Sequence, residues 1–99
     1  SGREMKGDHY CLVVSPRSFN ERFKLAMVCP ISQGAAETAR FGGFLVTLMG
    51  AGLKTVGNVH VHQLKSLDWG VRKATKSERA PDFVVGQVLQ ALIAVFDDE

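Results

Sequence analysis

The sequence has little of what marks a membrane-spanning, secreted or metal-binding protein. It has no apolar run near the roughly 20 residues that a membrane-spanning helix needs, and no signal-peptide pattern at its start. Its two cysteines, Cys11 and Cys29, lie in apolar runs and are too far apart for a CxxC metal knuckle. We therefore expect a cytoplasmic protein with two reduced, buried thiols. A disulfide between neighbouring strands would require an oxidising compartment.

A strong surplus of charge is also absent, because the formal net charge is only +2. Nucleic-acid binding is permitted by this value but not demanded by it. Hydrophobic residues make up 45% and charged residues 22% of the 99-residue chain, which is ordinary for a globular protein and argues against disorder. The length fits one domain, which we assign to residues 1–99.

Short β-rich runs dominate the first three quarters of the chain. We expect strands over residues 9–15, 24–31, 44–49, 56–64 and within 70–76, a tight turn at residues 18–20, and loops over residues 1–8 and 32–43. The long loop of small and polar residues is of a length that is often functional. Several short strands and one long loop favour a mainly β fold with a small, strongly bent sheet or partial barrel.

The last segment has the spacing of an amphipathic helix that begins near Pro81 and Asp82. The apolar stripe consists of Val84, Val88, Leu92 and Val95. Gly86 interrupts the helix at a cost of about 1 kcal/mol relative to alanine, so burial of the stripe must outweigh it. We expect this helix to pack against the sheet.

The sequence His60-Val61-His62 lies on an expected strand, where alternation would place both imidazoles and Asn58 on one face. A free histidine titrates at about pH 6.5, so one ring can be neutral while its neighbour is protonated. This pair suits RNA cleavage, in which a base activates the ribose 2′-OH and an acid protonates the departing 5′-oxygen. Two other interpretations remain open: plain surface histidines, and a metal site that lacks an evident third ligand.

Two loops carry further candidates. Arg3 and Glu4 in the N-terminal loop could clamp a phosphate and serve as a base. Arg40 and Phe41 in the long loop could bind a phosphate and stack on a base, as single-strand platforms do. Taken without further context, both segments are more typical of solvated loops. Trp69 could stack on a base, pack at a subunit interface or pack in the core.

Several motifs follow one another in a fixed order. They are the stretch from Gly7 to Asn20 (GDHYCLVVSPRSFN), Pro30-Ile31-Ser32, the stretch from Thr38 to Phe44 (TARFGGF), the stretch from Gly52 to Gly57 (GLKTVG) followed by a strand and Gln63, and Ala80-Pro81 before the final helix. No single motif is as specific as a zinc knuckle. Their ordered series, which spans nearly the whole chain, resembles the MazF/PemK (ChpB-like) toxin family of type II toxin–antitoxin systems.

The resemblance implies an SH3-like small barrel of the CcdB/MazF/PemK type that forms a homodimer. It also implies an endoribonuclease (mRNA interferase) that cuts single-stranded RNA without a metal or cofactor and leaves a 2′,3′-cyclic phosphate and a 5′-hydroxyl. The expected partner is a proteic antitoxin of the MazE/PemI type, whose extended acidic tail occupies the RNA groove. The RNA-binding residues expected on this basis are Ser32, Gln33, Arg40, Gly42, Phe44, Val56, Asn58 and Gln63.

The sequence departs from the family where its chemistry should lie. The family's N-terminal histidine is replaced by Arg3, its arginine and aspartate are replaced by His60 and His62, and its glutamate matches Glu4. We hypothesise that His62 or Glu4 is the general base, the other histidine the acid, and Arg3 the phosphate clamp. The family's first strand also has no counterpart in this sequence, which we interpret as a shortened chain with an unpaired sheet edge.

Two alternatives lie outside RNA cleavage. One is a catalytically altered or inactive relative that binds only RNA or antitoxin. The other is a CcdB-like toxin that binds DNA gyrase. The gyrase-binding mode resides in a Trp-Gly-Ile ending, whereas this helix ends in Val95-Phe96-Asp97, which argues against it.

Overall fold

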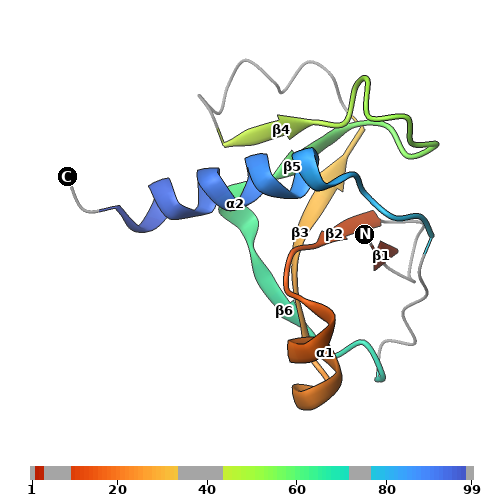
Figure 1. Cartoon of the computed structure of the whole chain (residues 1–99), viewed down its shortest axis with the longest axis vertical. Coiled ribbons are helices and arrows are strands. Elements are labelled where there is room, and N and C mark those ends of the chain that lie inside the picture. Colours follow the sequence, from red (N-terminus) through yellow and green to blue (C-terminus); the bar gives the residue numbers. More distant parts are fainter. Residues whose placement is uncertain (1, 4–9, 34–43, 72–76, 98–99) are drawn as a thin grey trace.

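The computed structural model describes residues 2–3, 10–33, 44–71 and 77–97. Its elements, shown in Figure 1, are strands β1 (Gly2–Arg3) and β2 (Tyr10–Val13), helix α1 (Arg17–Phe23), strands β3 (Ala26–Ser32), β4 (Leu45–Thr47) and β5 (Asn58–His60), the 3-10 turn η3 (Val61–Gln63), strand β6 (Lys65–Leu67) and helix α2 (Asp82–Phe96). The expected mainly β fold with a C-terminal helix is confirmed.

Strand β3 is the centre of the sheet. The strand order is β1-β2-β3-β5-β4, and every described pair is antiparallel. On the edge of β3 away from β2, β5 pairs with the end of the strand (Ser32 opposite Asn58), while β6 pairs with its start (Met27 opposite Ser66). The chain therefore turns a corner at η3 to run along both halves of one edge of β3.

Apolar side chains gather on both faces of the sheet. The larger cluster includes Leu12, Cys29, Val59 and Val61 and is covered by α2, whereas the smaller one contains Cys11, Ala26, Val28 and Leu67 beside Trp69. The two cysteines are free and buried, as predicted, and they belong to different clusters. Burial, helped by the nearby Cys11, raises the pKa of the Cys29 thiol to about 11, so this thiol is protonated at neutral pH.

Helix α2 begins after Pro81, which occupies the N-cap rather than the expected first helical position, and Asp82 lies in its first turn. It packs against β4 and η3. The predicted stripe is buried at Val84 and Val88, but Val95 at the far end is exposed. Among the described helices, none is long and apolar enough to cross a membrane.

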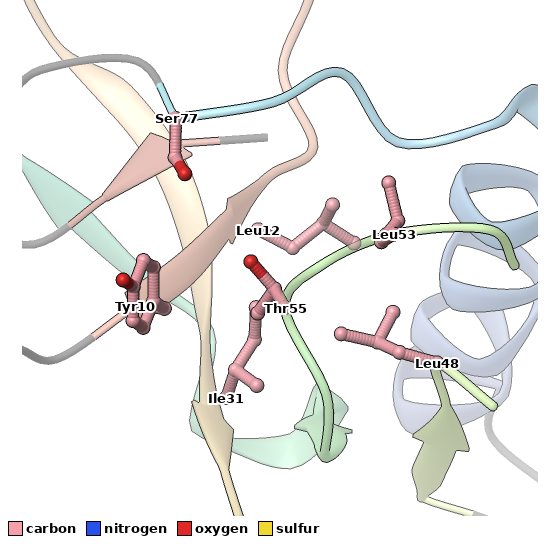
Figure 2. Close-up of a pocket in the computed structure, with 7 residues that line it drawn as sticks. All are labelled: Tyr10, Leu12, Ile31, Leu48, Leu53, Thr55 and Ser77. Atoms are coloured by element: carbon pink, nitrogen blue, oxygen red, sulfur yellow. The ribbon is translucent and has the colours of Figure 1, made fainter.

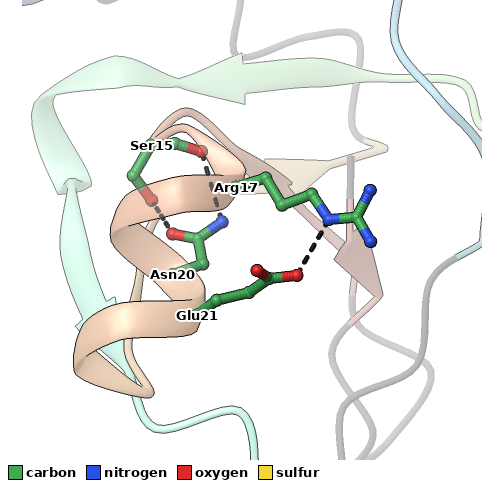
Figure 3. A network of polar contacts seen from close by, with 4 residues as sticks. All are labelled: Ser15, Arg17, Asn20 and Glu21. Carbon is green, nitrogen blue, oxygen red and sulfur yellow. Dashed lines mark hydrogen bonds and ion pairs between the residues drawn. The ribbon is translucent and has the colours of Figure 1, made fainter.

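The tight turn expected at residues 18–20 is wrong, because these residues lie inside helix α1. A polar network supports this helix (Figure 3): the Ser15 hydroxyl donates to Asn20 Oδ1, and Asn20 Nδ2 donates to the Ser15 carbonyl at 3.3 Å. The Met27 amide also donates to Ser15 Oγ at 2.9 Å, which ties the helix to β3. Lys24, in a left-handed conformation with φ 58°, ends the helix.

One loop prediction and two strand predictions also need correction. The N-terminal loop contains β1, in which Gly2 and Arg3 pair with β2. The strand expected over 56–64 is limited to Asn58–His60, because the chain enters η3 at Val61. The strand expected within 70–76 is not found at residues 70–71, which form a turn, and residues 72–76 lie outside the described part; a strand instead occurs at Lys65–Leu67.

Candidate active site

The centre of the candidate site is a contact between Ser32 and His60. Ser32 is the last residue of β3, and His60 is the last residue of β5, the strand that pairs with this end of β3. Ser32 Oγ lies 2.6 Å from His60 Nε2, which is a short hydrogen bond. His60 is only 6% exposed, whereas Ser32 is half-buried. The sheet register therefore joins a buried imidazole to a hydroxyl nearer the surface.

Gly57 allows this arrangement by its lack of a side chain. Its φ is +128°, a conformation that L side chains rarely adopt. A Cβ at this position would run into the carbonyl oxygen of Ser32. The approach to β5 can lie against the end of β3 only because residue 57 is glycine.

His62 does not share a strand face with His60, so the alternation expected for His60-Val61-His62 is wrong. The strand ends at His60, and His62 lies in the 3-10 turn. The two rings are nevertheless neighbours, with centroids 5.9 Å apart and an interplanar angle of 49°. His62 is exposed, and the Phe44 ring lies beyond it at 6.4 Å between centroids. The corner at η3 thus brings an exposed imidazole beside the buried one.

The other expected site residues fall into three groups. Gln33, Val56 and Gln63 are exposed, Phe44 is half-buried, and Asn58 is buried at 6% exposure. Only the backbone of Arg3 is described, as part of β1. Glu4, Arg40, Gly42 and Phe41 lie outside the described residues. Within the described ranges, no group of three or more His, Cys, Asp or Glu side chains could hold a metal ion, so the HxH pair has no third ligand there.

A second polar contact, which the sequence did not suggest, lies at Glu78. Its carboxylate accepts hydrogen bonds from the Lys54 amide at 3.0 Å, the Thr55 amide at 2.7 Å and the Thr55 hydroxyl at 2.7 Å. The Lys54 amide contributes most to lowering the pKa of this carboxyl group, followed by the two Thr55 donors. Glu78 thereby fastens the segment before β5 to the segment before α2. Its partners are more than 20 positions away in the sequence, so no local pattern marks them.

A small pocket lies beside this contact. Figure 2 shows its lining side chains, which are Tyr10, Leu12, Ile31, Leu48, Leu53, Thr55 and Ser77. Most of the lining is apolar, and the hydroxyl-bearing residues come from three separate segments. The pocket shares Thr55 with the Glu78 contact and is continuous with the larger apolar cluster through Leu12 and Leu48.

The Ser32–His60–His62 group places two imidazoles next to a hydroxyl, and both kinds of side chain are used for proton transfer in proteins. A histidine ring accepts or donates a proton near neutrality, and a serine hydroxyl can do both at once. One of the two imidazoles is accessible to a ligand from solvent, and Phe44 offers an aromatic ring next to it. This combination suits acid–base chemistry on a ligand that has flat bases and phosphates.

Comparison with known proteins finds a matching family and similar relatives. Residues 1–96 match the family described as PemK-like, MazF-like toxin of type II toxin–antitoxin systems. The chain is 34% identical to endoribonuclease PemK of Escherichia coli over 95 residues, covering 96% of this chain and 71% of the relative. It is 36% identical to endoribonuclease toxin ChpB of Escherichia coli strain K12 over 98 residues, covering 98% of this chain and 83% of the relative.

A solved structure, the MazE–MazF complex (Form-II) from Deinococcus radiodurans, superposes with a TM-score of 0.80 at 29% identity, covering 96% of this chain and 87% of that one. The family match covers far more than half of the chain, and both sequence relatives exceed 30% identity. The chain therefore belongs to the family of PemK-like, MazF-like toxins of type II toxin–antitoxin systems.

Proposed function

We propose that this toxin is an endoribonuclease that cuts single-stranded RNA, including mRNA, by acid–base attack of the ribose 2′-OH and without a metal ion. The relatives PemK and ChpB carry the name endoribonuclease. The observation that carries the mechanism is the pair of adjoining imidazoles, 5.9 Å between centroids, of which one is exposed. The products are a 2′,3′-cyclic phosphate and a 5′-hydroxyl.

The exposed position of His62 suits a group that touches the RNA, so His62 is the favoured general base, with Glu4 as the alternative. His60 is then the source of the proton for the leaving 5′-oxygen. Arg3 clamps the phosphate and stabilises the charge that develops on it. Ser32, Gln33, Phe44, Val56, Asn58 and Gln63 form the described part of the proposed RNA-binding surface. Arg40 and Gly42, which lie outside the described residues, are its further proposed members.

The partners of the toxin follow from its family. A proteic antitoxin of the MazE/PemI type binds over the RNA groove and blocks it, as the existence of MazE–MazF complexes supports. The toxin acts in the cytoplasm as a homodimer. The exposed apolar side chains in the second half of α2 are suited to a contact between subunits.

Cleavage of purified RNA in EDTA tests this proposal. We expect the wild-type toxin to cut in EDTA, and the rate to follow a bell-shaped pH profile with limbs near neutrality. His62→Gln should lower the rate by about 10²-fold or more, since a positioned base contributes about that much. Lys65→Gln on β6 removes a nearby exposed cation and is the matched control, which should cut normally.

The outcomes separate the alternatives. Absence of cleavage at every pH, with RNA still bound, would identify a binding-only relative. Loss of activity in EDTA that returns with a divalent cation would reject the metal-free mechanism. Equal cleavage rates for His62→Gln and Lys65→Gln would show that His62 takes no part in catalysis.

A further inference from the structure

The buried position of His60 raises a question about how it could act on RNA. At 6% exposure its ring is enclosed by protein, and its Nε2 lies 2.6 Å from the Ser32 hydroxyl. Ser32 is the more exposed member of the pair, because it is half-buried at the end of β3. A proton leaving Nε2 therefore meets Ser32 Oγ before it can meet any ligand.

We propose that Ser32 is a catalytic proton relay, through which the buried His60 protonates the departing 5′-oxygen of the RNA. This inference rests on the proposed endoribonuclease function and assigns the acid half of that reaction. Ser32 then contacts the RNA directly, whereas His60 acts behind it.

The step balances in protons and bonds. The ribose 2′-oxygen bonds to phosphorus as its proton passes to His62, and the bond between phosphorus and the 5′-oxygen breaks. The 5′-oxygen takes the Ser32 hydroxyl proton while Ser32 Oγ takes the Nε2 proton of His60. A hydroxyl has one donor hydrogen and two acceptor lone pairs, so both transfers can occur together. His62 ends protonated and His60 neutral, and exchange with water restores both.

The backbone holds the relay in place from two sides. Ser32 pairs with Asn58 across the β3–β5 ladder, two residues before His60 on the same strand. Gly57 lets the chain before β5 lie against the Ser32 carbonyl. A site built on strands holds its side chains in more precise positions than a site built on loops. Proton transfer over short distances requires such precision.

Two RNA substrates distinguish a relay from a structural hydroxyl. The first is ordinary RNA, and the second has sulfur in place of the bridging 5′-oxygen at the cut site, because a thiolate leaves without protonation. On ordinary RNA we expect Ser32→Ala to lower kcat by about 10²-fold, the lower end of what general acids contribute. On the sulfur-bridged RNA the same variant should fall within about threefold of wild type, because no acid is needed there.

Other variants complete the pattern. Ser32→Thr keeps a hydroxyl and should restore most of the rate on ordinary RNA. His60→Gln should behave like Ser32→Ala on both substrates, while His62→Gln should be slow on both because the base is still required. Ser66→Ala, on the exposed face of β6, is the matched serine control and should cut both substrates normally.

Three results would overturn the relay. Normal cleavage of ordinary RNA by Ser32→Ala would show that the hydroxyl is not needed. An equal loss on both substrates, in a variant whose circular dichroism and Tm match wild type, would show a structural role only. Failure of the wild-type toxin to cut either RNA would reject the proposed function itself and the relay with it.

Discussion

The two halves of helix α2 are both apolar, but only the first half contains fully buried side chains. In the first half, Val84 and Val88 are fully buried, and the segment leading into the helix is fastened by Glu78 and by the buried Ala80. In the second half, Ile93 is 68% and Phe96 is 76% exposed. Figure 1 shows this end of the helix extending away from the sheet.

The difference indicates that the apolar side chains of this helix serve two purposes. The first turns complete the core of this chain, and Ala91 and Leu92 still pack against it, whereas Ile93, Val95 and Phe96 are exposed. Exposed apolar patches on small proteins mark surfaces that another molecule covers. We therefore assign the second half of α2 to the contact between subunits in the proposed homodimer.

The largest difference between the two halves of α2 is expected when a charge is placed in each of them. Val88→Asp puts a carboxylate into the core without a partner, and we expect a loss of about 4 kcal/mol or more, which would unfold much of the protein. Ile93→Asp puts the same charge in an exposed position and should change the free energy of unfolding of the monomer by only about 0.5 kcal/mol. Urea unfolding at low protein concentration measures both.

The same Ile93→Asp variant tests the subunit contact. Light scattering over a concentration series should show weaker self-association than for the wild type. An unchanged dimer would mean that this half of the helix does not form the contact.

A smaller change sharpens the comparison by removing methyl groups alone. Val84→Ala leaves a cavity in the larger apolar cluster, and we expect it to cost about 2–3 kcal/mol, from lost burial plus the cavity. Val95→Ala, on the exposed half, should cost less than about 0.5 kcal/mol in the monomer. Thermal unfolding of the two variants beside wild type gives the difference, and equal losses would contradict the division of the helix.

The Glu78 carboxylate, which holds the segment before helix α2, predicts that the stability of the protein depends on pH. The hydrogen bonds from Lys54 and Thr55 lower the pKa of Glu78 from 4.5, so its ionised form is favoured in the folded state. This contribution is complete above the unfolded pKa and is lost as pH falls through the folded pKa. We expect Glu78→Gln to unfold more easily at pH 7 and to lose less stability than wild type on acidification.

A control for this prediction is Glu21→Gln, which removes an exposed carboxylate that pairs with Arg17 on α1 at 2.9 Å. Exposed pairs of this kind contribute only about 0.3–0.5 kcal/mol. An acid response of Glu78→Gln that matches that of Glu21→Gln would show that the Glu78 contact does not stabilise the fold.

The smallest effect is expected at Gly86, in the first half of the helix. A Cβ there would meet no atom within 4 Å, so Gly86→Ala should stabilise the protein by about 0.5–1 kcal/mol through helix propensity. Gly52→Ala also has open space but a φ of +76°, and it should be destabilising. Tm should rise for Gly86→Ala and fall for Gly52→Ala. A lower Tm for both variants would mean that a side chain at position 86 meets a neighbouring residue.

The sheet and helix α2 were readable from the sequence because their signals are local and repeated. The 3.6-residue period of α2 and the apolar runs of β2 and β3 each specify one element. Helix α1 was missed because Pro16, Ser18 and Asn20 are typical of turns, and its support comes from Ser15 through a network that also reaches Met27. Strand β6 was missed because Lys65 and Ser66 are polar and its pairing with β3 is distant in sequence.

The candidate site was only partly predictable for the same reason. Sequence placed His60 and His62 together, but it placed them on one strand face, because nothing in Val59-His60-Val61-His62 interrupts the alternation. The corner at η3 arises from the need to pair β5 and β6 with opposite ends of β3. The Ser32–His60 bond joins residues 28 positions apart, and no local pattern reports such a contact.

Strand β3 pairs with a neighbouring strand along its whole length, so no part of it can open without breaking this pairing. Its amides and carbonyls are shared among β2, β5 and β6, so opening any stretch of Ala26–Ser32 breaks a ladder on at least one side. In hydrogen–deuterium exchange this strand should therefore be the slowest segment to take up label. A split version of the toxin, assembled from two fragments, would need its break elsewhere, for example at the exposed turn of Met49 and Gly50.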